Sequence, residues 1–410
     1  MAWCDALLRK MLELSASDLH LSSGVQPNFR LNGEMVPAGG EPVVDAQEIV
    51  GYLKELTPKR IWMEFQEAWD ADFAYELPEC GRFRVNLFMD HHGSGAVFRL
   101  IPTEIPTAAD LGLPPAILKM CDHSKGLILV TGPTGSGKST TLAAMIDTIN
   151  RNRAEHIITI EDPIEFVHPN RRCLINQREI SRHTVSFKRA LRAALREDPD
   201  IILVGEMRDL ETVAIAIETA ETGHLVFGTL HTSTAASTVD RIIDQFPTDR
   251  QSQIRMMLSG SLKGVIAQTL CKKIGGGRVA AHEILICNQA VSSLVREGKT
   301  HQITSMMQMG GKEGMRLLND ELLEMTEKGL IEADEAYRRC AAKDDMLTKL
   351  EAAGRELSRE AAAAKAAPQP ATAIAPPRKQ PQPEPVPVGA GGGGGFADPF
   401  EAFRRKRNGT

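Results

Sequence analysis

The stretch GPTGSGKST at residues 132–140 constrains the fold of this chain more than any other part of the sequence. It matches the pattern G-x-x-x-x-G-K-[ST] at every fixed position, between a strand-like run at 127–131 and a helix-like run. In that context the glycines let backbone N–H groups close around phosphates, and the N-terminus of the helix adds its dipole. We therefore predict that a nucleotide is bound by Gly132, Pro133, Thr134, Gly135, Ser136, Gly137, Lys138, Ser139 and Thr140.

Two side chains of this phosphate loop have distinct expected tasks. Lys138 should reach the β- and γ-phosphates, and the hydroxyl of Ser139 should be a ligand of Mg²⁺. ATP and Mg²⁺ are therefore the predicted cofactors. A glycine-rich turn without a ligand is the alternative, which the full match in the required context disfavours.

The sequence around the loop predicts an α/β domain. Between Gly126 and about Val279, apolar strands alternate with helices, as in LILVT, IITIED, IILVGE and LVFGTL. Such alternation is typical of a mostly parallel sheet with helices on its faces. Open sheets of this kind bind ligands at the carboxyl ends of their strands.

Acidic residues and one histidine stand where strands of this sheet should end. ITIEDPIEF groups Glu161, Asp162 and Glu165 around a proline, which we interpret as a catalytic cluster; a helix cap is the alternative. In ILVGEMRD a strand delivers Glu206, whose carboxylate is expected to reach the hydration shell of Mg²⁺ or the attacking water. His231, in GTLHT, is expected to hydrogen-bond a γ-phosphate; a packing or surface histidine is the alternative.

The chain divides into four parts by composition and pattern. Residues 1–100 predict a small α+β domain, and 101–115, with four prolines, predict a linker. Residues 116–350 predict the α/β domain with helices at its C-terminal end. Residues 351–410 are Ala/Pro- and Gly-rich, so we expect a disordered tail.

The composition excludes several classes of protein. The chain has 410 residues, a net charge of −5 and seven cysteines without a CxxC pair, which favours a soluble cytoplasmic protein with reduced thiols. No stretch has the ~18 apolar residues of a membrane span. No basic, aromatic-rich patch is evident, so nucleic acid is not an expected partner.

The motifs together resemble the secretion and pilus motor ATPases, and within them the PilT-type retraction ATPases of type IV pili. The similarity extends over roughly residues 15–350. It is carried by SASDLHL, RFRVNLF, VFRLIP, GPTGSGKSTTLAAMID, ITIEDPIEFVH, REDPDIILVGEMRD, TGHLVFGTLHT, RIIDQFP and KKIGGGRVAAHEIL.

This resemblance implies a RecA-like ATPase domain preceded by a PAS-like domain, assembled as a homohexamer. It implies that Glu165 and Glu206 are the catalytic carboxylates, with Glu206 placing the lytic water and the hydrated Mg²⁺, and that His231 senses the γ-phosphate. Arg84 and Arg99 match arginines that approach the γ-phosphate of a neighbouring subunit; surface charge on a strand is the alternative. The implied function is ATP-driven pilus retraction, in the cytoplasm at the inner membrane, with the platform protein of the pilus machine as partner.

Two differences from related families bear on the function. Assembly and secretion ATPases carry cysteine pairs that are missing after Cys271, which favours the retraction branch. The retraction family's AIRNLIRE helix reads AVSSLVRE here, with Ser292 and Ser293 in place of Arg and Asn. That element is tied to retraction rather than to hydrolysis, so an accessory ATPase that works with a sibling motor remains a candidate, beside an assembly or secretion ATPase.

The last residues of the tail have a composition of their own. FADPFEAFRRKRNGT follows the Pro/Gly-rich segment 361–395. Its three phenylalanines would share one face of an induced helix, and a block of four basic residues follows, 404–407. We interpret it as a tether to the inner-membrane platform; an end without function is the alternative.

Overall fold

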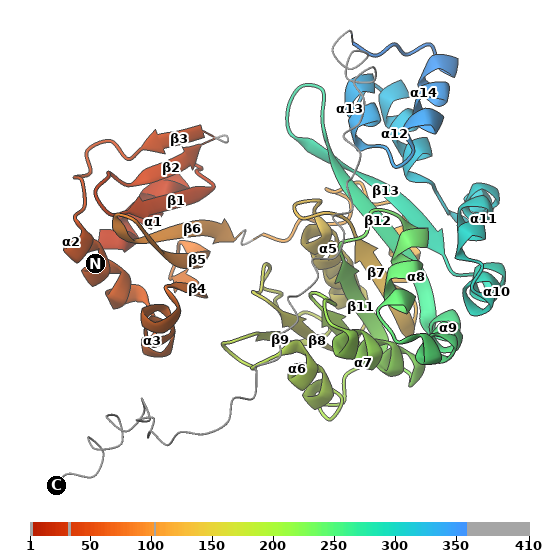
Figure 1. The fold of residues 1–410 in the computed structure, drawn as a ribbon, viewed down its shortest axis with the longest axis horizontal. Helices are drawn as coiled ribbons and strands as arrows, with labels where there is room; N and C mark the ends of the chain where they lie inside the picture. Colours follow the sequence, from red (N-terminus) through yellow and green to blue (C-terminus); the bar gives the residue numbers. More distant parts are fainter. Residues whose placement is uncertain (1–2, 32–33, 102–103, 359–410) are drawn as a thin grey trace, which may run out of the picture. The chain divides into compact units, whose positions relative to one another are not determined.

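Two separate β-sheets organise the described chain, one before the phosphate loop and one around it (Figure 1). The computed structural model describes residues 3–31, 34–101 and 104–358. The aromatic-basic end predicted as a tether, with the rest of 359–410, lies outside the described residues. The α/β fold class predicted from the sequence is confirmed.

The first sheet is antiparallel throughout, in the order β3-β2-β1-β6-β5-β4. Its strands are β1 (Asp18–Ser22), β2 (Asn28–Leu31), β3 (Glu34–Pro37), β4 (Asp70–Leu77), β5 (Gly81–Asp90) and β6 (Gly93–Ile101). Its helices are α1 (Trp3–Glu13), α2 (Ala46–Leu56) and α3 (Lys59–Ala68).

The two-residue period of β5 explains which face of this sheet is covered. Phe83, Val85 and Leu87 are fully buried in one apolar cluster with residues of the three helices, whereas Arg84 between them is exposed. Because neighbouring side chains on a strand point to opposite faces, the helices cover one face. The other face carries the arginines.

The second sheet has the order β13-β12-β7-β11-β10-β8-β9, and every pair is parallel except β12–β13. Its strands are β7 (Gly126–Thr131), β8 (His156–Glu161), β9 (Leu174–Glu179), β10 (Ile201–Val204), β11 (Leu225–Leu230), β12 (Leu262–Lys272) and β13 (Arg278–Ile286). The predicted mostly parallel sheet is therefore confirmed.

Helices cover this sheet and continue beyond it. The helices that lie between β6 and β12 in the chain are α4 (Pro115–Met120), α5 (Lys138–Asn152), α6 (Phe187–Ala194), α7 (Leu210–Glu221), α8 (Ala235–Asp244) and α9 (Thr248–Ser261). After β13 follow α10 (Gln289–Glu297), η1 (Thr300–Gln302), α11 (Ile303–Met309), η2 (Gly310–Glu313), α12 (Leu318–Glu327), α13 (Ala333–Arg339) and α14 (Lys343–Ala352).

The strands of the parallel sheet are buried on both faces. Two apolar clusters, one on each side, take alternate residues of the same strands: Leu127 and Leu129 belong to one, and Ile128 and Val130 to the other. Continuous apolar runs are what a doubly covered parallel sheet requires. A further cluster packs α12, α13 and α14 against β12 and β13.

The ordered domains extend further than the predicted boundaries. The first sheet continues to Ile101, and Leu113 is buried against the second sheet, so both ends of the predicted linker 101–115 belong to folded parts. At the other end α14 continues to Ala352 and Leu357 packs on the last cluster, so the second domain extends beyond residue 350, at least to Leu357. Apolar packing, not composition, decides both ends.

Two further features bear on the predicted class of protein. All seven cysteines are free thiols, and five of them are buried. Among the helices that the structure describes, none is long and apolar enough to cross a membrane.

Candidate active site

The phosphate loop leads from β7 into α5, and its backbone requires glycine. Gly132 has φ +143° and Gly137 has φ +87°, which other residues rarely adopt. A Cβ at Gly132 would also lie 2.2 Å from the carbonyl oxygen of Gln268 in β12, which leaves no room for a side chain. The motif is therefore held open by backbone conformation and by close packing on β12.

The side chain of Gln268 forms hydrogen bonds with both the phosphate loop and α5. Its side-chain nitrogen donates to the carbonyl oxygen of Ser136 at 2.7 Å, and its side-chain oxygen accepts from the hydroxyl of Thr141 at 2.7 Å. Both hydrogen bonds are buried, so each is costly to lose. One amide thus ties the loop to the first turns of α5.

Lys138 lies across the loop and close to two of the predicted acids. Its Nζ donates to the carbonyl oxygens of Gly132 at 2.8 Å and Pro133 at 3.1 Å. Burial lowers the pKa of this lysine, and the carboxylates of Glu206 and Glu165 oppose that shift. Three residues that lie far apart in the sequence therefore share one electrostatic environment.

Glu206 and His231 meet at the ends of adjacent strands. β10 and β11 are parallel neighbours, with Val204 beside Gly228, so the residues that follow them emerge at the same edge. His231 Nε2 lies 2.7 Å from Oε1 of Glu206, and the guanidinium of Arg208 forms an ion pair with the same oxygen.

The protonation state of Glu206 follows from these contacts. Burial disfavours its charged form, but the hydrogen bonds from Arg208 and His231 outweigh that cost and hold the pKa of Glu206 below its ordinary value. The carboxylate is therefore ionised at neutral pH. Gly205 just before it allows the close approach of β8, because a Cβ there would lie 3.0 Å from the carbonyl oxygen of Ile160.

The acidic segment after β8 separates its acids by environment. Burial raises the pKa of Glu161 to about 7, although Thr159 and Gln177 donate hydrogen bonds to its carboxyl group at 2.5 and 3.1 Å. Glu165 is exposed between the buried side chains of Ile164 and Phe166. Glu165 is therefore accessible to solvent, whereas the carboxyl group of Glu161 is held by hydrogen bonds within the protein.

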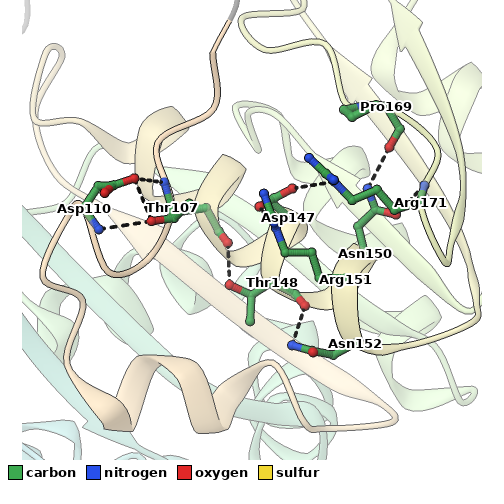
Figure 2. A network of polar contacts seen from close by, with 10 residues as sticks. Thr107, Asp110, Asp147, Thr148, Asn150, Arg151, Asn152, Pro169 and Arg171 are labelled. Atoms are coloured by element: carbon green, nitrogen blue, oxygen red, sulfur yellow. Dashed lines mark hydrogen bonds and ion pairs between the residues drawn. The ribbon is translucent and has the colours of Figure 1, made fainter.

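The far end of α5 is fixed to the chain that connects the acidic segment with β9 (Figure 2). Asp147 forms ion pairs with Arg151 at 2.6 Å and with Arg171 at 3.4 Å. Asn150 donates to the carbonyl oxygen of Pro169 at 2.7 Å and accepts from the backbone N–H of Arg171 at 3.2 Å. These contacts join the helix of the phosphate loop to the connection that follows the acidic segment.

Arg84 and Arg99 lie elsewhere, on the exposed face of the first sheet. They are cross-strand partners of β5 and β6. Arg99 Nε donates to the buried carboxylate of Asp18 at 2.7 Å, and Arg84 pairs with Asp72 at 3.7 Å. The structure of one chain therefore brings these arginines to each other, and their described ion pairs do not join them to the phosphate loop.

The donor set fits a nucleotide with its magnesium ion. The hydroxyl of Ser136 is buried and has no hydrogen-bond partner among the described residues, as expected of a group that faces a ligand. Ser139 begins the first turn of α5 with Lys138. The described residues contain no cluster of three His, Cys, Asp or Glu side chains that would cage a metal.

Sequence reasoning missed three polar residues that shape this site. Arg208 stands in the motif around Glu206 but was assigned no role. Gln177 of β9 holds the acidic segment by accepting from the N–H of His168 at 2.8 Å and donating to the carbonyl oxygen of Phe166 at 2.8 Å. Gln268 was not singled out either, and no local pattern marks a glutamine whose partners lie more than 100 residues away.

The known proteins that are similar to this chain point to one family. The family model described as "Type II/IV secretion system protein" matches residues 2–276. The type IV pilus retraction ATPase PilT of Pseudomonas aeruginosa is 51% identical over 330 residues, covering 80% of this chain and 96% of that protein. The type IV pilus ATPase PilU of the same organism is 38% identical, over 83% and 90% of the two chains.

A solved structure gives the same result. A crystal structure of the pilus retraction motor PilT with bound ADP aligns with a TM-score of 0.80 at 45% identity, covering 84% of this chain and 98% of that one. The resemblance predicted from the sequence motifs is thereby confirmed. The chain belongs to the type II/IV secretion system protein family, in its branch of PilT-type pilus retraction ATPases.

Proposed function

We propose that this protein is an ATP-hydrolysing homohexameric motor that retracts type IV pili by depolymerising pilin, the step that drives twitching motility. The observation that carries the proposal is the meeting of Glu206 and His231 at 2.7 Å, in the electrostatic environment of Lys138 on a complete phosphate loop. Membership of the PilT-type branch supports retraction as the direction in which the motor moves the pilus.

Each side chain has a task in the proposed reaction. Lys138 leaves the loop carbonyls to bind the β- and γ-phosphates of ATP. Glu206, ionised at neutral pH, orients the attacking water, and Glu165 is the second carboxylate. His231 contacts the γ-phosphate and, through its hydrogen bond to Glu206, relates the presence of that phosphate to the position of the carboxylate.

Mg²⁺ would be held by the hydroxyl of Ser139, with Glu206 reaching its hydration shell. When bound, it neutralises charge on the phosphates. The remaining work belongs to the protein: the loop N–H groups orient the phosphates, and Gln268 fixes the loop that presents them.

The purified protein tests the enzymatic part. We expect magnesium-dependent ATP turnover, abolished by Lys138→Ala because the phosphates lose their cation. Lys188→Ala, at an exposed ion pair on α6, is the matched control and should keep its turnover. A folded wild-type protein that hydrolyses no ATP, alone or with a partner motor, would contradict the proposal.

The resemblance also supports an arrangement of domains and subunits. We propose that the second domain is RecA-like, that the first is PAS-like, and that Arg84 and Arg99 of one subunit serve the site of the next. The exposure of Arg99 supports that role, since its side chain is 67% exposed although Asp18 accepts from its Nε.

An accessory role beside a sibling motor is the second candidate, favoured by the altered helix α10. Ser292 and Ser293 lie on α10, which forms with Asn288 as its N-cap and Gly298 at its C-terminal end. A deletion strain separates the candidates. We expect excess surface pili and lost retraction; full retraction by a sibling ATPase would establish the accessory role, and loss of pili an assembly role.

For localisation we propose the cytoplasmic face of the inner membrane, with the platform protein as partner and the C-terminal residues as tether. Truncation after Glu360 should keep ATP turnover and reduce recruitment of the fluorescently tagged protein to the pilus base, because the basic block is lost. Replacing the four basic residues 404–407 by serine provides the matched full-length control for charge. Normal localisation and retraction after truncation would refute the tether.

A further inference from the structure

Glu283 is a buried acid of β13 that the proposed reaction does not use. Its side chain is only 5% exposed, and no basic side chain is among its described hydrogen-bond partners. Instead, Oε1 accepts the backbone N–H of Ala235 at 2.7 Å, and Oε2 accepts the backbone N–H of Leu318 at 3.2 Å. Burying a carboxylate is costly unless it is hydrogen-bonded, so these two contacts explain why it stands there.

The two partners are the first residues of two helices. Ala235 begins α8 and Leu318 begins α12. The first N–H groups of a helix have no partner within it and carry the positive end of its dipole, so a carboxylate is a favourable acceptor there. One side chain thus joins the beginning of α8 to the helical unit α12–α14.

The strand register places this contact beside the active site. Glu283 pairs with Ala267 of β12, Ala267 pairs with Thr131 of β7, and Thr131 pairs with Leu230 of β11. Thr131 immediately precedes the phosphate loop and Leu230 immediately precedes His231. The acid therefore belongs to the same cross-strand row from which both functional segments emerge.

The segment between His231 and α8 is short and fixed at both ends. At its start, His231 contacts Glu206, and the hydroxyl of Thr232 lies 2.7 Å from that of Thr238. At its end, Thr234 caps α8 and the next N–H is bound by Glu283. Only three residues, 232–234, separate the histidine from the first residue of α8, so a displacement of the beginning of α8 is transmitted to His231.

We propose that Glu283 is a positioning residue for ATP hydrolysis, which sets the place of His231 through the beginning of α8 and makes that place depend on α12. The inference rests on the proposed function for the role of His231. It adds that the C-terminal helical unit takes part in arranging the ATP site, by one carboxylate shared between two helices.

Glu283→Gln is the test variant, because it keeps the shape but offers one acceptor oxygen and an amide group that meets a backbone N–H. Glu335→Gln is the matched control. Glu335 is equally buried and accepts from the N–H of Lys272 and from Arg339, so it joins β12 to α13 without a contact to α8.

For Glu283→Gln we expect kcat to fall about tenfold with the KM for ATP changed less than about threefold, and Glu335→Gln to keep kcat within about twofold. Combined with His231→Ala, the substitution at 283 should reduce kcat no further, because it acts through the histidine. Equal losses in the two buried-acid variants, or a folded Glu283→Gln protein with wild-type kcat, would overturn the proposal.

Hydrogen exchange gives a readout that does not need turnover. Backbone amides in 231–238 should lose protection in Glu283→Gln and keep it in Glu335→Gln. If the wild-type protein hydrolyses no ATP, the proposed function fails, while this comparison still decides whether Glu283 fixes the segment. Unchanged exchange in 231–238 would show that it does not.

Discussion

One oxygen of Glu206 accepts two donors, the imidazole of His231 and the guanidinium of Arg208. The charge of the carboxylate makes this arrangement favourable, because a hydrogen bond with an ionised donor or acceptor is about twice as strong as a neutral one. A nucleotide that attracts His231 would therefore change the surroundings of the carboxylate at the same time. We therefore expect ATP hydrolysis to depend on how the negative charge of Glu206 is shared between His231 and Arg208.

Replacing that carboxylate by an amide tests its role. Glu206→Gln should bind ATP with nearly unchanged affinity but turn it over roughly 10²-fold more slowly, because the group that orients the water loses its charge. Binding of a fluorescent nucleotide and steady-state turnover measure the two effects. Glu211→Gln, at an exposed ion pair on α7, is the control, and unchanged turnover at position 206 would make Glu206 a structural acid.

Glu161 predicts a pH dependence of stability. Its pKa is raised from 4.5 to about 7 by burial, so the folded protein binds this proton more tightly than the unfolded chain. Stability is then lost as pH rises from 4.5 to 7, and the loss is complete above that range. Glu161→Gln should avoid it, so the variant should gain roughly 2 kcal/mol relative to wild type between pH 5 and pH 8.

Denaturant unfolding of both proteins at the two pH values measures this difference. Other titrating groups cancel, because they are common to both chains. A difference in unfolding free energy that is the same at pH 5 and pH 8 would show that Glu161 ionises normally in the folded protein.

At the scale of elements, the hairpin of β12 and β13 supports the active site without containing a catalytic group. Gln268 on one strand holds the phosphate loop, and Glu283 on the other holds the beginnings of α8 and α12. Their partners lie in the phosphate loop, α5, α8 and α12. We therefore propose that this hairpin takes part in arranging the ATP site.

Gln268→Leu should weaken nucleotide binding about tenfold, since the carbonyl oxygen of Ser136 and the hydroxyl of Thr141 both lose a buried partner. Calorimetric titration with ADP measures the change. Thr269→Val, at the next residue of the strand and therefore on its other face, is the control. Equal affinity in the leucine variant would mean that the loop keeps its shape without the glutamine.

The sequence alone predicts the strands and the loop that carry the candidate site, but not the polar residues that hold them in place. The phosphate loop, the strands that carry Glu206 and His231, and the parallel sheet all follow from local pattern, because period and turn residues are local properties. Gln177, Gln268 and Glu283 are polar residues within strands, and their partners are fixed only by the folded register. Arg208 was visible in its motif, yet its ion pair with Glu206 is a contact between side chains that only the folded structure shows.

At the scale of the whole molecule, the residues that we propose for the reaction belong to two domains. Lys138, Glu206 and His231 belong to the second domain, whereas Arg84 and Arg99 are adjacent on the first sheet. In the proposed ring each site is completed by arginines from a neighbour. This division can be tested by mixing subunits.

Lys138→Ala and Arg99→Ala proteins should each be inactive, and a mixture assembled from both should recover part of the turnover. In the mixture, an intact phosphate loop from one variant meets an intact arginine from the other. Mixing Arg99→Ala with the double variant Lys138→Ala/Arg99→Ala is the control and should stay inactive. Turnover in the first mixture equal to the sum of its parts would place Arg99 outside the neighbouring site.

The buried free thiols can report the order in which regions of this protein unfold. Burial raises the pKa of Cys4, Cys121 and Cys271 to about 12, so at pH 8 these thiols remain protonated in the folded protein and do not form the thiolate that reacts with alkylating reagents. Cys4 lies in the first domain, Cys121 beside the parallel sheet and Cys271 against the last helices. Alkylation at each position therefore records, in one chain and with no added label, the order in which the three regions come apart.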